Sequence, residues 1–209
     1  MKPEDFVTFL GEQRASAILR TSIPEAVEPA MDAAVRGGFR VIEFTLTTPD
    51  ALGWIERFSA RADLVVGAGT VIEVDDVDNA VRAGASFLVS PVVDEAVIER
   101  ALDLGIAIMP GTSTPTEMLR AWRAGAVLQK IFPAPAGGPA FAAACLGPLP
   151  FLRLVPTSGV DRENAAAWLA AGAWAVGFVA PLFDARALAE GRFDRVETRA
   201  RELLAAVAG

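Results

Sequence analysis

Gly37-Gly38-Phe39-Arg40-Val41-Ile42 joins the end of a helix-like stretch to a short apolar run, and this kind of junction recurs along the chain. It returns as Ala83-Gly84-Ala85-Ser86-Phe87-Leu88, Leu104-Gly105-Ile106-Ala107-Ile108, Ala124-Gly125-Ala126-Val127-Leu128 and Ala171-Gly172-Ala173-Trp174-Ala175-Val176. A glycine just past a helix end adopts the left-handed conformation at little cost. Each junction therefore predicts a helix that stops and a strand that starts.

The alternation predicts a parallel sheet, because each strand is followed by a helix that returns the chain to the same edge. The strands are expected near 16–20, 40–46, 64–70, 86–91, 106–111, 127–133, 153–159 and 173–180. Further helices are expected at 4–14 and 193–207. Eight such units favour a closed (β/α)8 TIM barrel over about 16–207, in one domain spanning 1–209 with an extra N-terminal helix. An open doubly wound sheet is the alternative.

Helix starts are also marked in the sequence. Thr48 and Thr114 each precede a proline, which predicts an N-cap threonine with proline at the first helical position. Glu117 completes a capping box with Thr114, so we interpret it as a capping residue. Asp94 and Asp161 are predicted to cap the helices that follow them.

Composition bounds the function. The chain has 209 residues, 53% hydrophobic and 22% charged, which is typical of a globular protein. Its formal charge of −7 and the absence of a basic patch argue against nucleic-acid binding. Glu4 and Asp5 argue against a secretory signal, and the single cysteine, Cys145, fits a reducing compartment, so we expect a cytoplasmic protein.

Two long uncharged runs, 131–152 and 165–183, have the length of membrane spans. Prolines and glycines interrupt both runs, so neither has the continuous helical character that a span requires. We therefore expect no membrane association.

The chain contains no histidine and no tyrosine. Proton transfer must then use carboxylates, lysine, the thiol or water. A histidine-based catalytic triad and a histidine-containing metal site are both excluded.

Barrel enzymes carry their chemistry at the carboxyl ends of the strands. Polar side chains expected there are Arg20, Glu43, Thr45, Thr47, Thr70, Ser90, Thr112, Ser113, Lys130, Thr157 and Ser158. On the second strand Glu43, Thr45 and Thr47 share one face, which we expect to point into the barrel.

Lys130 lies within an apolar strand. Burial lowers the pKa of a lysine, and a neutral amine is a nucleophile toward carbonyls, so Lys130 is a candidate for Schiff-base chemistry. The alternatives are a buried ion pair with Glu43, or a side chain that extends to the barrel mouth.

Gly67-Ala68-Gly69-Thr70 resembles the start of a dinucleotide-binding loop, but Ile72 stands where the third glycine is needed. We expect these glycines to let a ligand approach the strand end, with Thr70 as a hydrogen-bond donor.

Five motifs together resemble a known family. They are Glu43-Phe44-Thr45-Leu46-Thr47-Thr48-Pro49, Gly67-Ala68-Gly69-Thr70-Val71, Phe87-Leu88-Val89-Ser90-Pro91, Met109-Pro110-Gly111-Thr112-Ser113-Thr114-Pro115-Thr116-Glu117 and Gln129-Lys130-Ile131-Phe132-Pro133-Ala134. Their order and spacing are similar to those of the 2-keto-3-deoxy-6-phosphogluconate (KDPG) / 4-hydroxy-2-oxoglutarate (KHG) aldolases. The resemblance implies a class I aldolase on a (β/α)8 barrel, a homotrimer without metal or cofactor, acting in Entner–Doudoroff-type carbohydrate metabolism.

The resemblance also implies roles for individual residues. Lys130 would form a Schiff base with a 2-keto acid, and Glu43 would be the general acid–base. Thr70 would hold the substrate carboxylate, while Phe132 and Pro91 would form walls of the pocket. The implied substrate-binding set is Arg20, Thr45, Thr47, Thr70, Pro91, Phe132, Thr157, Ser158 and Gly159.

The chain departs from the family pattern at two places. Thr47 stands where many members have a carboxylate-binding arginine, for which Arg20 is a possible substitute. Thr157-Ser158-Gly159 and Phe178-Val179-Ala180 stand where the family has a Thr-Gly-Gly turn and a Gly-Ser pair for phosphate. An aldolase for an unphosphorylated 2-keto acid, a catalytically silent keto-acid-binding barrel and a phosphate-binding isomerase therefore remain alternatives.

Overall fold

The computed structural model describes residues 1–208. The strands are β1 (Ala15–Leu19), β2 (Val41–Thr45), β3 (Val65–Gly69), β4 (Phe87–Ser90), β5 (Ala107–Thr112), β6 (Gln129–Ile131), β7 (Leu154–Pro156) and β8 (Val176–Phe178). The helices are α1 (Pro3–Gln13), α2 (Val27–Arg36) after the short η1 (Pro24–Ala26), α3 (Ala51–Ser59), α4 (Val74–Arg82), α5 (Glu95–Asp103), α6 (Pro115–Arg123), α7 (Pro139–Leu146), α8 (Ala165–Ala170), α9 (Ala185–Ala189) and α10 (Phe193–Val207).

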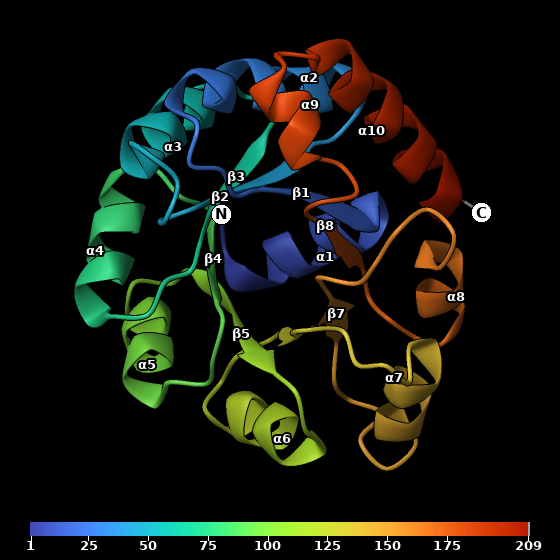
Figure 1. Cartoon of the computed structure of the whole chain (residues 1–209). Coiled ribbons are helices and arrows are strands. Elements are labelled where there is room, and N and C mark those ends of the chain that lie inside the picture. Colours follow the sequence, from blue (N-terminus) through green and yellow to red (C-terminus); the bar gives the residue numbers. More distant parts are fainter. Residues whose placement is uncertain (209) are drawn as a thin grey trace.

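The strands form one parallel sheet in the order β7-β6-β5-β4-β3-β2-β1-β8. The two ends of this sheet meet through a parallel bridge between Thr157 and Gly177 and through the Trp174 N–H, which donates to the Leu154 carbonyl at 2.8 Å. A ring of helices surrounds the strands (Figure 1). The predicted (β/α)8 barrel is confirmed, and the open sheet is excluded.

The five junction glycines explain why the chain alternates so regularly. Gly38, Gly84, Gly105, Gly125 and Gly172 all have positive φ, between 67° and 118°. Each ends a helix in the left-handed conformation, as predicted. All eight strands are present, although the last three, with three residues each, are shorter than expected.

One of the predicted helix caps is wrong. α3 begins at Ala51 after Asp50 in the left-handed conformation, so Thr48 is not its N-cap. The Thr48 hydroxyl instead donates to the Leu19 carbonyl at 3.3 Å, which ties the loop after β2 to the end of β1. Asp94 does cap α5.

The capping box of Thr114 and Glu117 at α6 is confirmed. Asp161 accepts backbone hydrogen bonds from Glu163 and Asn164 in the turn before α8, whose own N-cap position is Asn164.

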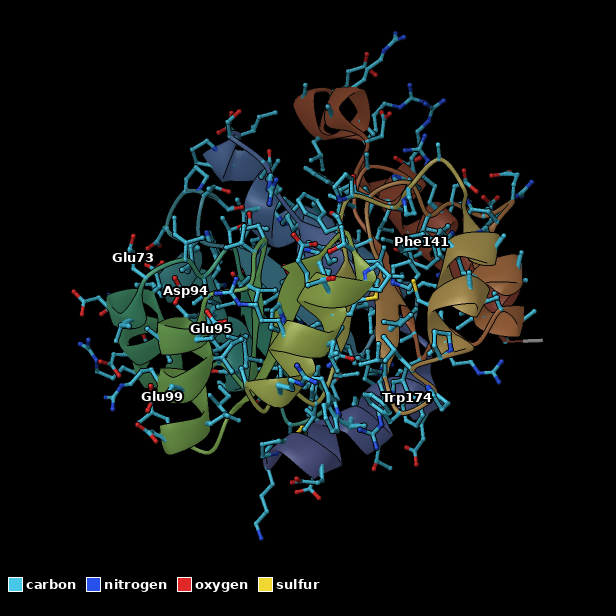
Figure 2. The ribbon with its side chains drawn as sticks, turned by 90° about the horizontal axis from the view of Figure 1, so that it is seen from below. Glu73, Asp94, Glu95, Glu99, Phe141 and Trp174 are labelled. Atoms are coloured by element: carbon cyan, nitrogen blue, oxygen red, sulfur yellow. The ribbon has the colours of Figure 1, made fainter. Side chains whose placement is uncertain are left out.

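Helix α1 closes the amino-terminal end of the barrel. Its apolar residues Phe6, Val7 and Leu10 are buried against inward-facing strand residues. The Phe6 ring stacks on that of Phe87, with centroids 4.4 Å apart. The side view in Figure 2 shows α1 across one end of the barrel, with Trp174 beside it, whose indole N–H donates to the Val7 carbonyl.

The lower half of the barrel interior is therefore apolar and closed. The strand residues packed there are Val41, Val65, Phe87, Val89, Ala107, Met109, Leu128, Val155 and Ala175. Polar chemistry is confined to the opposite, carboxyl end of the strands. Within residues 1–208, no helix has the length and apolar character needed to cross a membrane.

Removing the Phe6 ring tests how much this closure stabilises the barrel. Phe6→Ala should lower the free energy of unfolding by about 3–5 kcal/mol, because it leaves a cavity against Phe87. Urea denaturation measures the change. Thr8→Ala, on the exposed face of α1, is the control and should change stability by less than about 0.5 kcal/mol. Equal effects of both variants would show that α1 does not hold the core.

Candidate active site

Two ionisable side chains lie inside the upper half of the barrel. Glu43 in β2 is 1% exposed and Lys130 in β6 is 5% exposed. On β2 the alternation of side chains turns Ile42 and Phe44 into the core under the helices, so Glu43 points into the barrel. The structure thus confirms the inward face that the sequence predicted for Glu43.

Burial shifts both pKa values toward the neutral forms. Desolvation raises the pKa of the Glu43 carboxyl above its usual range, although the positive charges of Lys130 and Arg20 oppose this shift. Desolvation likewise lowers the pKa of Lys130, with the charge of Arg20 lowering it further and that of Glu43 raising it. The site therefore favours a neutral amine beside a carboxyl group that can carry a proton.

Glu43 and Lys130 do not form a direct ion pair. Among residues 1–208, no Lys130–Glu43 contact falls within 4.0 Å, and Glu43 Oε2 is buried without a hydrogen-bond partner. The alternative of a direct ion pair with Glu43 is thus wrong, and the Lys130 side chain is 5% exposed. A buried carboxyl oxygen without a hydrogen bond lowers the stability of the fold. Such atoms are rare in proteins, and a catalytic role is one explanation for them.

Phe132 faces Lys130 across the end of β6. Lys130 Nζ lies 4.7 Å from the centroid of the Phe132 ring. Phe132 and Pro91 also line a cavity of about 230 Å³ together with Gly111 and Ser113. The two residues predicted as pocket walls are thus brought together, with Phe132 in contact with the amine.

Arg20 and Thr70 meet at the mouth of the barrel. The Arg20 guanidinium donates to Thr70 Oγ1 at 3.0 Å. Thr70 has φ 62°, an uncommon conformation for a β-branched residue that costs of order 1–3 kcal/mol and is often found at binding sites. Arg20 and Thr47 also line a cavity of about 370 Å³ between β1 and α9.

Threonine and serine hydroxyls brace the strand ends around these groups. Thr45 Oγ1 lies 3.0 Å from Thr47 Oγ1, and Thr45 is buried whereas Thr47 is exposed. Thr112 and Ser113 donate to the carbonyls of Lys130 and Phe132, each at 2.8 Å. These two hydroxyls therefore hold the β6 backbone that carries the lysine.

The turn after β7 is hydrogen-bonded to the segment that carries Lys130, because the Thr157 N–H donates to the Ile131 carbonyl at 3.0 Å. Thr157 is buried and its hydroxyl has no hydrogen-bond partner, while Ser158 and Gly159 are exposed with φ 61° and 109°. After β8, the Val179 carbonyl accepts hydrogen bonds from Leu182 and Phe183. The Asn164 side-chain amide donates to the Gly159 carbonyl at 2.9 Å.

The glycines of β3 lie against side chains from neighbouring strands. A side chain at Gly67 would overlap the Phe87 ring, and one at Gly69 would overlap the Glu43 carboxylate. Glycine at these two positions therefore leaves room for the Phe87 ring and the Glu43 carboxyl group, and the approach of a ligand to the strand end stays a prediction. The sequence contains a signal for this packing. Residues 67 and 69 lie on the same face of the strand, and glycine at both leaves that face open to side chains from neighbouring strands.

Within residues 1–208, there is no group of three or more histidine, cysteine or acidic side chains that could hold a metal ion.

Comparison with known proteins places this site in a family. Residues 8–199 match the family model "KDPG and KHG aldolase". The chain is 37% identical over 165 residues to a 2-dehydro-3-deoxy-phosphogluconate aldolase of Pseudomonas aeruginosa, covering 78% of this chain and 75% of the relative.

Two solved structures extend the comparison. A KDPG aldolase from Legionella pneumophila, with pyruvate captured at low pH as a covalent carbinolamine intermediate, has a TM-score of 0.86 at 25% identity and covers 94% of this chain and 97% of its own. A cube-shaped protein cage, designed by fusing symmetric oligomeric domains, has a TM-score of 0.85 at 31% identity. The match covers 92% of this chain and 71% of the cage chain.

A parallel barrel with a buried lysine and carboxyl group at the carboxyl ends of its strands defines a barrel enzyme of the lysine-dependent kind. The chain belongs to the KDPG and KHG aldolase family and is a carbon–carbon lyase.

The pKa of Glu43 predicts a pH-dependent effect of Glu43→Gln on stability. Because the folded pKa lies above the unfolded value of about 4.3, the wild type loses stability as the pH rises from that value through the folded pKa. Glutamine resembles the protonated acid and does not titrate. The variant should match the wild type below about pH 4 and be more stable by about 1–3 kcal/mol near pH 7.

Urea denaturation across this pH range measures the difference. Glu117→Gln is a control of opposite sign, because backbone hydrogen bonds lower the pKa of Glu117. That variant should be less stable than the wild type at neutral pH and match it in acid. A pH-independent effect of Glu43→Gln would contradict a buried carboxyl group whose pKa is raised.

Proposed function

We propose that the protein is a class I aldolase that reversibly cleaves a KDPG-like or 4-hydroxy-2-oxo acid to pyruvate and an aldehyde. The observation that carries this proposal is the burial of Lys130 in the same barrel as the buried Glu43, which lowers the pKa of the amine and raises that of the carboxyl group. Membership in the aldolase family and the pyruvate carbinolamine in the Legionella relative agree with it.

Lys130 Nζ attacks the C2 carbonyl of the keto acid and forms a carbinolamine. Glu43 donates a proton to the departing hydroxyl, which leaves as water and gives a protonated imine. The Glu43 carboxylate then takes the proton of the C4 hydroxyl as the C3–C4 bond breaks. The bond electrons move to the imine nitrogen, so an aldehyde and a Lys130-bound enamine result. Glu43 returns the proton to C3, and hydrolysis releases pyruvate.

The substrate carboxylate binds to Arg20 and Thr70 in this proposal. The guanidinium and hydroxyl are already held together, and a charged hydrogen bond of this kind is among the stronger ones in proteins. Thr45 and Thr47 shape the adjoining wall through their hydroxyl contact. Phe132, with Pro91 behind it, forms the apolar side of the pocket next to the imine.

The far end of the substrate lies toward Thr157, Ser158 and Gly159. Whether this end carries a phosphate separates the main proposal from its first alternative. An unphosphorylated substrate is favoured by one feature, because Val179 and Ala180 present no side-chain donor after β8. We propose in addition a homotrimer in the cytoplasm, acting in Entner–Doudoroff-type metabolism. The symmetric oligomeric domains of the designed cage support the oligomer.

The Schiff base has a direct test. Incubation with pyruvate followed by borohydride reduction should attach a reduced pyruvyl group to Lys130, found by peptide mass spectrometry. Lys130→Met should abolish the adduct, and Lys2, the other lysine, is an internal control that should stay unmodified. A folded protein without any adduct would favour the silent barrel over the aldolase. Screening free and phosphorylated aldehydes with pyruvate then identifies the partner.

Removal of the Arg20 guanidinium should weaken pyruvate binding. Arg20→Leu is expected to raise the pyruvate concentration needed for half-maximal adduct formation by about 10- to 100-fold, since a charged hydrogen bond is lost. Arg57→Leu, which removes an exposed ion pair with Glu28 and a contact with the Trp54 ring, is the matched control and should leave that concentration unchanged. An unchanged value for Arg20→Leu would remove Arg20 from the carboxylate site.

A further inference from the structure

Gly69 occupies a strand position that disfavours glycine. It is the last residue of β3 and pairs with Thr45 of β2, in a regular extended segment. Its φ is not positive, so the backbone does not require glycine there. Glycine in a strand loses conformational entropy on folding and contributes no side-chain packing, at a cost of roughly 0.5–1 kcal/mol. Another constraint must favour it.

That constraint is the carboxyl group of Glu43. A Cβ atom built on Gly69 would overlap Glu43 Oε1 and would lie 2.7 Å from Cδ and 3.0 Å from Cγ. The end of the Glu43 side chain therefore rests in the space that any other residue at position 69 would fill. The three nearest atoms all belong to this one side chain.

Glu43 has little freedom to escape such an overlap. It is 1% exposed, and its Oε2 atom is enclosed without a hydrogen-bond partner. No hydrogen bond therefore orients Oε2, so packing against its neighbours constrains the carboxyl group. Position 69 borders the carboxyl group directly, because an added Cβ there would overlap Glu43 Oε1.

We propose that Gly69 is a positioning residue for the Glu43 carboxyl group, and that the missing side chain at position 69 sets the location of the proton shuttle relative to Lys130. This inference rests on the proposed function, because it assigns Glu43 the proton transfers. Since the overlap involves the far end of a side chain and no backbone atom, Gly69→Ala is expected to displace the carboxyl group and keep the fold.

Exchange of the pyruvate C3 hydrogens with deuterium tests this without knowledge of the aldehyde. Exchange needs the imine on Lys130 and a correctly placed base, and proton NMR in D2O measures its rate. Gly69→Ala should lower the rate by about 100-fold, the effect expected from a catalytic group misplaced by about 1 Å.

Glu43→Asp provides the specific partner for a double-mutant cycle. Aspartate is one methylene shorter, so its carboxyl group is withdrawn from position 69. Adding Gly69→Ala to this slower variant should reduce exchange by less than about threefold, since the overlap is gone. Equal losses in the Glu43 and Glu43→Asp backgrounds would overturn the proposal, as would full activity of Gly69→Ala.

Gly67→Ala is the matched control. Gly67 lies two residues earlier on the same strand face, and its added side chain would meet the Phe87 ring instead of Glu43. This variant should lower the melting temperature, and its effect on exchange should be the same in both backgrounds. A purely structural effect of Gly69→Ala would follow this pattern.

A second measurement separates this inference from the proposed function. The ¹³C shift of the Glu43 carboxyl group, followed against pH, should give a different pKa in Gly69→Ala than in the wild type, and an unchanged pKa in Gly67→Ala. If the wild type neither exchanges pyruvate hydrogens nor forms the adduct, the proposed function fails. The titration then still decides the placement of Glu43, and identical curves for Gly69→Ala and the wild type would overturn it.

Discussion

The burial of Glu43 and Lys130 within one barrel is the constraint on which the rest of the structure depends. Moving an isolated ion out of water costs several kcal/mol even after relaxation, and these two groups do not offset that cost with a direct ion pair. Their opposite charges act on each other only at longer range, together with Arg20. The groups respond by shifting their pKa values toward the neutral forms, which is the state that amine attack and proton donation require.

The apolar half of the barrel contributes stability that offsets the cost of burying these two ionisable groups. Helix α1 closes the amino-terminal end, and the stacked rings of Phe6 and Phe87 fill the interior beneath the ionisable pair. Burial of this apolar surface stabilises the fold, whereas the upper half gives up stability for function. The division follows the barrel axis, so catalytic groups lie at one end and stabilising contacts at the other.

The residues of β3 show how closely packing and chemistry are linked. Gly67 accommodates the ring of Phe87, and Gly69 two residues later accommodates the carboxyl group of Glu43. The same strand face thus serves the core at one position and the site at the next. Sequence reasoning interpreted both glycines as space for a ligand, because it cannot tell which side chain from a neighbouring strand fills a gap. The misassigned cap at Thr48 has a similar origin, since its hydroxyl bonds to the end of β1, far away in the chain.

The sequence by itself determined the barrel and the pair of residues at its centre. Glycine junctions and the alternation of side chains along a strand are local signals. They predicted the eight strands, the terminal helices and the inward face of Glu43. Local signals suffice for these features because backbone conformation and side-chain direction depend on near neighbours. Only the tertiary structure decided that Lys130 lies unpaired against Phe132, that Arg20 meets Thr70, and that Gly69 makes room for Glu43. The contacts of Arg20 with Thr70 and of Gly69 with Glu43 join strands separated along the chain, so they follow from how the barrel closes and not from any one segment.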